Sequence, residues 1–495
     1  MKAVTSVYNM RISDKNTIEN KIPSLELMYK AGEGIYKSVD WHGKILVVCG
    51  KGNNAGDGYV VAQLLKDGGY DVEILLLEKA FSPDGKYYFD ICNSKKVPWS
   101  VYNLGKIQGY DIILDCIFGT GFKGNVEGSA RALIEGINES GAYVVSADIN
   151  SGLNGDSGLC SICVKSDLTI SIGTYKSGHF LNMAKDKIGK LINIDIGIDL
   201  LEKPYLLLEK ADAYKFLGRR DNFTNKGTYG YVTLIGGCLE YSGAVKLANL
   251  AATAMRSGSG VVKLAIPKSI CTSVAPYLLE STLYPLSDTD GSVKFCENEI
   301  QGALNNVKAL AIGMGWGQRG DNSQILKYIL ENYSLPVIID ADGLNTLAKM
   351  DSAILRNSKC KAVLTPHLKE FERLCGVPVA KIQESPIEYA KEYAKSTGAV
   401  LLLKGPTTVI TDGDTVFLSS TGCAGMATAG SGDVLSGILC AMCGAHNDIL
   451  KAVGIGAFIN GYAGQMAQAE YGDISMIASD TARFIAKAIK ELTKD

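Results

Sequence analysis

The sequence predicts an α/β protein built from two consecutive domains, each around a mainly parallel sheet. Short apolar runs recur without in-out alternation, as strands covered by helices on both faces require. The segments between these runs are long enough for crossover helices, and several runs end in glycine-containing loops. With 495 residues and 46% hydrophobic content, the chain has the length for two or more domains with buried cores.

Five apolar runs predict the strands of a doubly wound sheet in the first half. A helical pattern around Ser24 to Val39 precedes them, and we expect this helix to pack on the sheet. The strand-forming runs are ILVVCG (45–50), VEILLL (72–77), IILDCIFG (112–119), YVVSADI (143–149) and LTISIG (168–173).

The second half repeats this pattern after a charged, proline-containing stretch at residues 200–222, which predicts a domain boundary there. We therefore expect domains at residues 1–208 and 209–495. The strand-forming runs of the second domain are YVTLIGG (231–237), GVVKLAI (260–266), ALAIGMG (309–315), PVIIDAD (336–342), AVLTP (362–366) and AVLLLKG (399–405).

Composition excludes several classes of partner. Fifty Lys and Arg balance 52 Asp and Glu, so no overall field favours nucleic acid or an anionic membrane. The N-terminus lacks the apolar core of a signal peptide, and no run reaches the roughly 20 apolar residues that cross a bilayer. These features predict a cytoplasmic protein that binds neither nucleic acid nor membrane.

The 13 cysteines lie mostly in apolar runs, which is typical of reduced, buried thiols. Two CxxC spacings occur, Cys160 with Cys163 and Cys440 with Cys443. We do not expect them to form a zinc site, because the pairs lie far apart and the second falls in an apolar helical pattern.

A polar loop, GKGNNAGDG at residues 50–58, follows the first strand directly and opens a helical pattern. This arrangement predicts a ligand site at the carboxyl edge of the sheet. The loop fits the Rossmann spacing GxGxxA only weakly, because the Asp57 carboxylate would repel a pyrophosphate, and it lacks the GK[ST] of a Walker A loop. Its amides and oxygens suit a polar substrate and a hydrated monovalent cation.

Two further strand ends carry an aspartate followed by a glycine-containing loop, at residues 115–125 and 148–152. Each motif alone is typical of a solvated turn or helix cap. Because three such motifs follow strands of one sheet, together they favour a site in a crevice above it.

The segment Gly430-Ser431-Gly432-Asp433 opens an apolar helical pattern in the second half. Small residues let backbone amides bind a phosphate at a helix N-terminus, and Asp433 is placed to take a proton, which indicates phosphoryl chemistry. Alone, the motif is also typical of a turn and helix cap. Three neighbouring motifs follow apolar runs and favour the site: KGPTT at 404–408, TPHLKEFER at 365–373 and GMGWG at 313–317. His367 by itself fits a helix-capping or surface role equally well.

These motifs, in this order, resemble those of NAD(P)H-hydrate repair enzymes over nearly the whole chain. The first three are similar to the NAD(P)H-hydrate epimerase domain, and the later ones to the ADP/ATP-dependent NAD(P)H-hydrate dehydratase of the ribokinase-like superfamily. The resemblance implies a Rossmann-like N-terminal sheet and a ribokinase-like C-terminal domain. It also implies interconversion of R and S hydrates of NADH or NADPH, and dehydration of the S form with ADP or ATP.

The resemblance also implies the site residues. The hydrate in the epimerase domain would contact Asn53, Asn54, Ala55, Gly56, Asp57, Gly119, Thr120, Gly121, Phe122, Lys123, Gly124, Asn125 and Asp148, and K⁺ would bind Asn54, Asp115 and Ser151. The hydrate in the dehydratase domain would contact Gly315, His367, Leu368, Lys369, Glu370, Phe371, Glu372, Arg373 and Asp433. The nucleotide would contact Lys404, Gly405, Pro406, Thr407, Thr408, Cys423, Ala424, Gly425, Met426, Ala427, Thr428, Ala429, Gly430, Ser431 and Gly432.

Four departures from the family pattern stand out. Ala55 replaces a usual glycine, Asn150 a proline and Asn225 a histidine, and Cys423-Ala424 replaces Asn-Pro or Asn-Ser. The first two leave the ligand-bearing residues intact. The last two put base or ribose contacts in doubt and leave Asp433 in place.

The implied catalytic residues are Asp433, as the base that activates the hydrate hydroxyl toward the nucleotide, and Asp148, as the acid or base of epimerisation. Lys123 is a second acid/base candidate. Loss and return of the hydroxyl, or ring opening and closure, both remain open as routes. We also expect Mg²⁺ with the nucleotide and a homo-oligomer.

Two other functions remain open. One is a ribokinase-like kinase for a sugar or vitamin alcohol, with a non-catalytic N-terminal nucleotide-binding domain. The other is a non-catalytic scaffold, which would tolerate loss of acidic and cation-site residues. Because Asn54, Asp57, Asp115, Asp148 and Asp433 are all present, the sequence favours catalysis.

Overall fold

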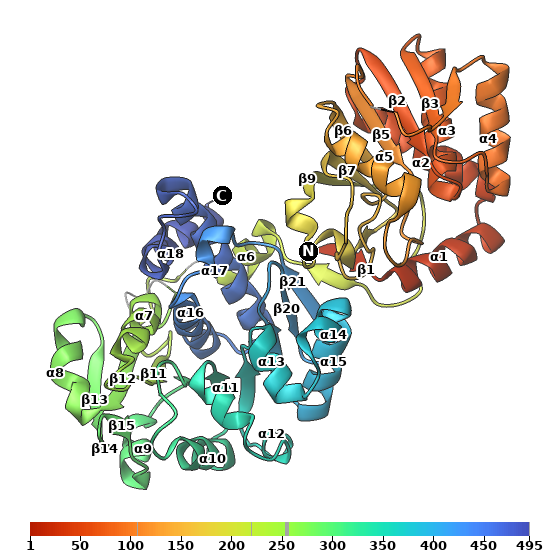
Figure 1. Ribbon diagram of the computed structural model, residues 1–495. Coiled ribbons are helices and arrows are strands. Elements are labelled where there is room, and N and C mark those ends of the chain that lie inside the picture. The colour runs from red at the N-terminus through yellow and green to blue at the C-terminus, as the bar shows by residue number, and fades with distance from the viewer. Residues whose placement is uncertain (106, 219, 253–256, 495) are drawn as a thin grey trace. The chain divides into compact units, whose positions relative to one another are not determined.

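A computed structural model describes residues 1–105, 107–218, 220–252 and 257–494 (Figure 1). The chain divides into two compact units. One comprises Ala3–Tyr205, and the other comprises the chain from Leu206 onward together with Met1–Lys2.

The N-terminal unit is built on a seven-stranded, wholly parallel sheet in the order β4-β3-β2-β5-β6-β7-β9. All five predicted strands are confirmed. The strand bounds are β2 Lys44–Cys49, β3 Asp71–Leu76, β4 Trp99–Val101, β5 Ile112–Cys116, β6 Tyr143–Ala147, β7 Ser166–Ile172 and β9 Ile188–Ile194, and the short pair β1 Lys2–Thr5 and β8 Tyr175–Lys176 is parallel as well.

Helices cover both faces of this sheet, as the apolar runs predict. In β2, Ile45 and Val47 pack in one hydrophobic core and Leu46 and Val48 in another, because successive side chains point to opposite faces. The first core also receives α2 and α3, and the second receives α5. The helices are α1 Val7–Asn20, α2 Ser24–Ser38, α3 Asn53–Asp67, α4 Pro83–Ser94 and α5 Gly128–Asn138, with 3₁₀ turns at Ser177–His179 and Ala184–Asp186.

The strand order reverses between β2 and β5. β3 and β4 extend the sheet on one side of this pair, and β6, β7 and β9 on the other. Such a switch point leaves a crevice at the carboxyl ends of the two strands, since their loops run in opposite directions. The loops that follow β2 and β5 carry the first two predicted motifs. The predicted strand 112–119 ends at Cys116, so Asp115 lies within β5 and the rest of its motif lies in the loop.

The C-terminal unit has a larger sheet in the order β13-β12-β11-β16-β17-β18-β19-β20-β21-β10. Strands β13 through β19 in this order are parallel, and β20 is antiparallel to both β19 and β21. The bounds are β10 Tyr205–Leu207, β11 Tyr231–Ile235, β12 Val261–Pro267, β13 Thr282–Leu286, β16 Ala309–Ile312, β17 Pro336–Ile339, β18 Lys361–Leu364, β19 Val400–Leu403, β20 Thr408–Thr411 and β21 Val416–Ser419, and β14 Asp288–Thr289 pairs separately with β15 Ser292–Val293.

All six predicted strands of this unit are confirmed, although five of them end earlier than the apolar runs do. Gly313 shows why: its φ is +110°, and a Cβ there would lie 2.1 Å from the Asp340 carbonyl oxygen. The chain must turn at this glycine, which ends β16 at Ile312.

Helix α16, Ser431–Ala445, is the central helix of the C-terminal unit. Every residue from Val434 to Gly444 is buried, and the helix packs against α7, α17 and the sheet. The other helices are α6 Lys210–Leu217, α7 Ser242–Ala252, α8 Cys271–Val274, α9 Glu297–Ala303, α10 Asn322–Asn332, α11 Asp342–Leu347, α12 Ala353–Arg356, α13 Leu368–Cys375, α14 Val379–Glu384, α15 Pro386–Thr397, α17 Ile449–Tyr471 and α18 Ala478–Leu492, with 3₁₀ turns at Lys268–Ile270, Ala275–Tyr277 and Ala424–Met426.

Across the described ranges, no helix combines the length and the apolar character that crossing a membrane demands.

Candidate functional site

A cavity of about 650 Å³ lies in the N-terminal unit at the switch point between β2 and β5. Its wall includes most of the predicted epimerase residues: Asn53, Asn54, Asp57, Gly119, Thr120, Gly121, Phe122, Lys123 and Asp148. Ala55 and Gly56 are buried inside α3, and Gly124 and Asn125 are exposed in the following loop, so these four stand outside the wall. The structure thus brings three sequence motifs to one cavity.

Asp148 is held in an unusual backbone conformation by two neighbours. Its φ is +62°, a value that non-glycine residues adopt at some energetic cost. Its carboxylate accepts a charge-assisted hydrogen bond from Lys176 Nζ, and the Lys176 side chain is only 1% exposed. Lys176 Nζ also donates to the Ile172 carbonyl oxygen at 2.7 Å. The buried ammonium of Lys176 therefore fixes the position of this carboxylate.

His179 fixes the main chain of Asp148. Its Nδ1 accepts from the Lys176 amide at 3.0 Å, so Nε2 carries the proton and donates to the Asp148 carbonyl oxygen at 2.7 Å. Burial and, to a smaller extent, the nearby Lys176 charge lower the pKa of His179 to about 4. The ring is therefore neutral near pH 7 and serves as a structural clamp.

Asp57 and Asp14, also on the cavity wall, have raised pKa values. Burial raises the pKa of Asp57 well above its usual range, and the charges of Asp148 and Asp14 raise it further. Burial and the charge of Asp148 also raise the pKa of Asp14, on α1. Four carboxyls, those of Asp14, Asp57, Asp84 and Asp148, therefore line the cavity together with the buried Lys176.

A second polar cluster lies beside the cavity, around the buried Asp115 at the end of β5. This carboxylate accepts hydrogen bonds from the hydroxyl and amide of Ser151, from the Ser146 hydroxyl at 2.9 Å and from the Ile117 amide at 3.2 Å. Burial nevertheless raises the pKa of Asp115. Ser151 Oγ also accepts from the Phe118 amide, at 2.8 Å.

Asn54 completes this cluster from the start of α3. Its Nδ2 donates to the Phe118 carbonyl oxygen at 3.1 Å, while its Oδ1 is buried and has no hydrogen-bond partner among the described atoms. A buried amide oxygen without a donor is costly, and a bound cation would satisfy it. The donor set of Asn54, Asp115 and Ser151 is made of oxygens, which suits a hard cation.

In the C-terminal unit, Asp433 lies in the first turn of α16. The preceding Gly430 is left-handed at φ +92°, and no side chain in the described part of the protein caps this helix. Burial, together with the charges of Asp340 and Asp342, raises the pKa of Asp433 to about 7 against the opposing effect of Lys404. A carboxylate that is easily protonated at neutral pH is suited to act as a base.

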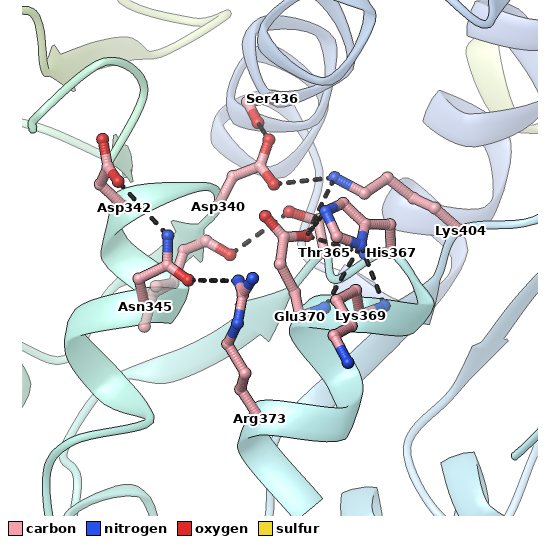
Figure 2. Close-up of polar contacts among 11 residues, drawn as sticks. Asp340, Asp342, Asn345, Thr365, His367, Lys369, Glu370, Arg373, Lys404 and Ser436 are labelled. Carbon is pink, nitrogen blue, oxygen red and sulfur yellow. Dashed lines mark hydrogen bonds and ion pairs between the residues drawn. The ribbon is translucent and has the colours of Figure 1, made fainter. Parts of the chain in front are cut away.

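Beneath this turn lies a buried ion pair that sequence reasoning missed (Figure 2). Lys404 Nζ contacts Asp340 Oδ1 at 3.0 Å and Glu370 Oε2 at 3.7 Å, and Ser436 of α16 donates to Asp340 Oδ2 at 2.7 Å. Burial alone would raise the pKa of Asp340, but Lys404 and the hydrogen bonds lower it below its usual range. A Cβ on Gly432 would lie 3.3 Å from Asp340 Oδ2 and 3.4 Å from Lys404 Nζ. Gly432 thus packs against the ion pair.

The predicted segment 367–373 forms the start of α13, and His367 is its N-cap. His367 Nδ1 accepts from the amides of Lys369 and Glu370, at 3.1 and 3.3 Å, and Glu370 Oε2 accepts from the His367 amide at 2.8 Å. Figure 2 shows these side chains beside Lys404. The helix-capping role of His367 is therefore confirmed, and its exposed ring remains accessible from solvent.

The remaining residues of this segment differ in exposure. Arg373 donates to Asn345 Oδ1 at 2.8 Å, and Asn345 Nδ2 donates to Asp342 Oδ1 at 3.3 Å (Figure 2). Phe371 is fully buried against Tyr393, so its side chain lies in the core rather than at the site surface. Leu368 is half-buried, and Glu372 pairs with Lys369.

The predicted nucleotide segments follow β19 and precede α16. Gly405 and Pro406 are exposed, Thr407 is buried and Thr408 begins β20. The later segment is tied down by Ser431 Oγ, which donates to the Met426 carbonyl oxygen at 2.8 Å, and by the Gly425 amide, which donates to Gln468 at 3.0 Å. Gly315, at φ +62°, lies in the loop after β16, and a Cβ there would meet the Tyr241 carbonyl oxygen at 2.5 Å.

The two CxxC pairs lie in different units, as their sequence positions suggest. Cys160 Sγ is 3.4 Å from Cys163 Sγ, and Cys440 and Cys443 are buried in α16. All four are free thiols.

Residues missed by the sequence analysis include Asp14, Lys176 and His179 in the N-terminal unit, and Asp340 and Ser436 in the C-terminal unit. Lys176, His179 and Asp340 closely follow apolar runs, so the strand-end criterion used for the other motifs could have found them. Asp14 and Ser436 lie within helices and carry no such signal.

Comparison with known proteins agrees with this geometry. A family model described as NAD(P)H-hydrate dehydratase matches residues 232–487, and one described as YjeF-related protein N-terminus matches residues 24–178. A bifunctional NAD(P)H-hydrate repair enzyme from Moorella thermoacetica is 34% identical, over 100% of this chain and 98% of its own. One from Archaeoglobus fulgidus is 32% identical, over 98% of each chain.

Solved structures resemble the C-terminal unit. An ADP/ATP-dependent NAD(P)H-hydrate dehydratase from Bacillus subtilis, co-crystallised with ATP/Mg²⁺, is 29% identical with a TM-score of 0.51, and the match covers 58% of this chain and 99% of that one. A ribokinase-like superfamily protein from Enterococcus faecalis has a TM-score of 0.50 at 20% identity, over 59% and 98% of the two chains, and shows the shared fold. By these matches and the motifs that they span, the chain belongs to the family of bifunctional NAD(P)H-hydrate repair enzymes.

Proposed function

We propose that the protein repairs hydrated NADH and NADPH in two steps. The N-terminal unit interconverts the R and S hydrates, and the C-terminal unit dehydrates the S form with consumption of ADP or ATP. The observation that carries this proposal is Asp433, a carboxylate with a pKa of about 7 at the N-terminus of a helix that no described side chain caps. Family membership supports hydrate repair over the kinase for sugars or vitamin alcohols.

In the dehydration, ionised Asp433 takes the proton of the substrate hydroxyl as that oxygen attacks the terminal phosphorus of the nucleotide. The bond from phosphorus to the nucleotide oxygen breaks. The α16 amides stabilise the negative charge that develops on the transferred group, because they point toward it at the positive end of the helix. Phosphate then leaves with the electron pair of its bond to carbon, and loss of a proton from the neighbouring carbon restores the ring double bond.

Lys404 and Asp340 support this step from below. Because Lys404 Nζ is 3.0 Å from Asp340 and 3.7 Å from Glu370, its charge is largely balanced by protein carboxylates. We infer that it positions the glycine turn and tunes Asp433, in addition to any contact with the nucleotide.

Mg²⁺ would accompany the nucleotide and neutralise phosphate charge. In the described chain, no group of three His, Cys, Asp or Glu residues is arranged to hold a metal ion, so phosphate oxygens would supply most of its ligands.

In the epimerase cavity, Asp148 is the proposed proton acceptor, since it lines the cavity and Lys176 holds its carboxylate in place. K⁺ would bind Asn54, Asp115 and Ser151, where the unpartnered Asn54 Oδ1 supports a cation. Its charge would offset that of the buried Asp115 and order the loop that begins at Ile117. Asp57 and the loop from Gly119 would hold the nucleotide part of the substrate.

The direct test supplies separated R and S hydrates of NADH and follows the return of reduced-nicotinamide absorbance with ATP, with ADP and with neither. We expect the S hydrate to recover at once with nucleotide, and the R hydrate to recover through epimerisation. No recovery under any condition would contradict the proposal and favour the small-molecule kinase.

Two variants assign the steps to their units. Asp433→Asn removes the base and should abolish dehydration while the R and S hydrates still interconvert. Asp115→Ala should abolish interconversion and spare dehydration of the S hydrate. An Asp433→Asn protein that dehydrates at the wild-type rate would refute the mechanism.

A further inference from the structure

One wall of the epimerase cavity comes from α1, which precedes the matched range 24–178. The wall residues of α1 are Val7, Met10, Arg11, Asp14 and Ile18. Their spacing places them on one face of the helix. This face therefore adds an acid and a cation to a cavity that the predicted motifs and α2 also line.

The opposite face of α1 is anchored by buried polar side chains. Asn9 donates to the Glu202 carbonyl oxygen at 3.1 Å and accepts from the Glu202 amide at 3.0 Å. Ser13 Oγ accepts from the Leu201 amide at 3.0 Å. The Val7 amide donates to Asp156 at 2.7 Å. The helix is thus fixed along its length, which gives Asp14 a defined position.

Asp14 faces the same cavity as Asp148, and the two are close enough for the charge of Asp148 to raise the pKa of Asp14. Their surroundings differ. Asp148 accepts a charge-assisted hydrogen bond from the buried Lys176, whereas burial raises the pKa of Asp14 and so favours its protonated form. Two carboxyls with opposed environments form an acid and base pair.

We propose that Asp14 is the acid of the epimerase site and acts on the substrate together with Asp148. The inference rests on the proposed epimerase function. In the route through loss of the hydroxyl, protonated Asp14 gives its proton to that oxygen as the carbon–oxygen bond breaks. Water leaves with the electron pair, and the ring nitrogen stabilises the cation. Water then adds to the other face and gives a proton to Asp148, and exchange with solvent restores both carboxyls.

Asp14→Asn tests this role, because it keeps the shape and removes the exchangeable acid. Separated R hydrate is incubated without nucleotide, and its conversion to S hydrate is followed by chromatography. We expect kcat to fall about 100-fold, with KM nearly unchanged. Asp14→Glu, which retains a carboxyl, should recover part of the rate, and only variants with a carboxyl should lose activity as pH rises. The control Glu19→Gln lies on the exposed side of the same helix and should keep the wild-type rate.

The pH profile must be judged against every charged group on the cavity wall: Arg11, Asp14, Lys51, Asp57, Asp84, Lys123, Asp148 and Lys176. Nucleotide-dependent dehydration of S hydrate by Asp14→Asn reports that the chain is folded. A wild-type chain that does not epimerise would contradict the proposed function. If the wild-type chain epimerises, two results would overturn only the role of Asp14. One is an Asp14→Asn chain with the wild-type kcat, and the other is an Asp14→Glu chain that is as impaired as Asp14→Asn.

Discussion

The pH dependence of dehydration tests the role of Asp433 most directly. Its pKa is raised from 3.8 to about 7, first by burial and then by the charges of Asp340 and Asp342. Because the base must be ionised, its active fraction is about one tenth at pH 6 and about nine tenths at pH 8. kcat/KM for the S hydrate should therefore rise about tenfold across this range. An aspartate of ordinary pKa would be fully ionised throughout and would give no such rise.

The nucleotide phosphates also titrate near pH 7, so a second variant is needed to identify the group. Asp340→Asn removes a charge that raises the pKa of Asp433 and leaves the nucleotide unchanged. We expect the midpoint of the profile to move down by about one pH unit. The assay measures initial rates from pH 5.5 to 8.5 at saturating nucleotide, with thermal unfolding of each variant as the folding control. A flat wild-type profile, or equal midpoints in the two proteins, would refute the assignment.

Three further perturbations follow from particular contacts. Gly432→Ala places a Cβ 3.3 Å from Asp340 Oδ2 and 3.4 Å from Lys404 Nζ. This crowds the turn at residues 430–432, so the KM for nucleotide should rise about tenfold. The control Gly243→Ala, whose Cβ meets no atom within 4 Å, should leave this KM unchanged. Asn54→Ala removes the unpartnered oxygen, so titration of epimerase activity with KCl against NaCl should lose its preference for K⁺; a retained preference would argue against that site. Lys176→Met leaves Asp148 without its buried partner and should lower the free energy of unfolding, measured in urea, by about 3 kcal/mol. The control Lys15→Met, in an exposed pair, should lower it by less than about 1 kcal/mol. Equal urea midpoints for the two variants would show that the buried pair adds nothing to stability.

The strands and the main motifs were predictable because burial on both faces leaves continuous apolar runs such as ILVVCG. Glycines and polar residues then mark where each strand ends. Since parallel strands have their carboxyl ends at one edge of the sheet, residues that follow different strands lie near one another in the fold. This is why the three motifs at residues 50–58, 115–125 and 148–152 could be brought together from the sequence, and why Asp433 could be assigned to a helix N-terminus. The choice of Asn54, Asp115 and Ser151 within those motifs came from the family resemblance.

Helix α1 shows where this reasoning fails. Its buried face carries Asn9, Ser13 and Thr17, so the apolar periodicity that signals a packed helix is absent. The helix is held by hydrogen bonds to Leu201 and Glu202, almost 200 residues away in the chain. No local sequence pattern indicates that α1 packs against residues so far along the chain, so Asp14 could not be placed at the cavity from the sequence.

Lys404 shows a second limit. A cation after a strand, beside threonines, indicates phosphate recognition, and the sequence does not reveal that Asp340 and Glu370 are its neighbours. The pairing depends on three strands being adjacent in the order β17, β18 and β19. The identity of the residue was therefore predictable, and its main partners were not.

Helix α16 is buried along nearly its whole length, so the position of the Asp433 carboxylate depends on how the core of its unit is packed. A surface loop can be remodelled one residue at a time, but a shift of this helix must be matched by every neighbour that touches it. Gly437 and Gly456 leave no space for even a methyl group, since a Cβ there would approach the Ala248 carbonyl oxygen to 2.1 Å or the Leu439 side chain to 2.7 Å. Changes in turnover can therefore arise from interior substitutions several turns away from the chemistry, and such substitutions would be mistaken for purely structural ones if only thermal stability were measured.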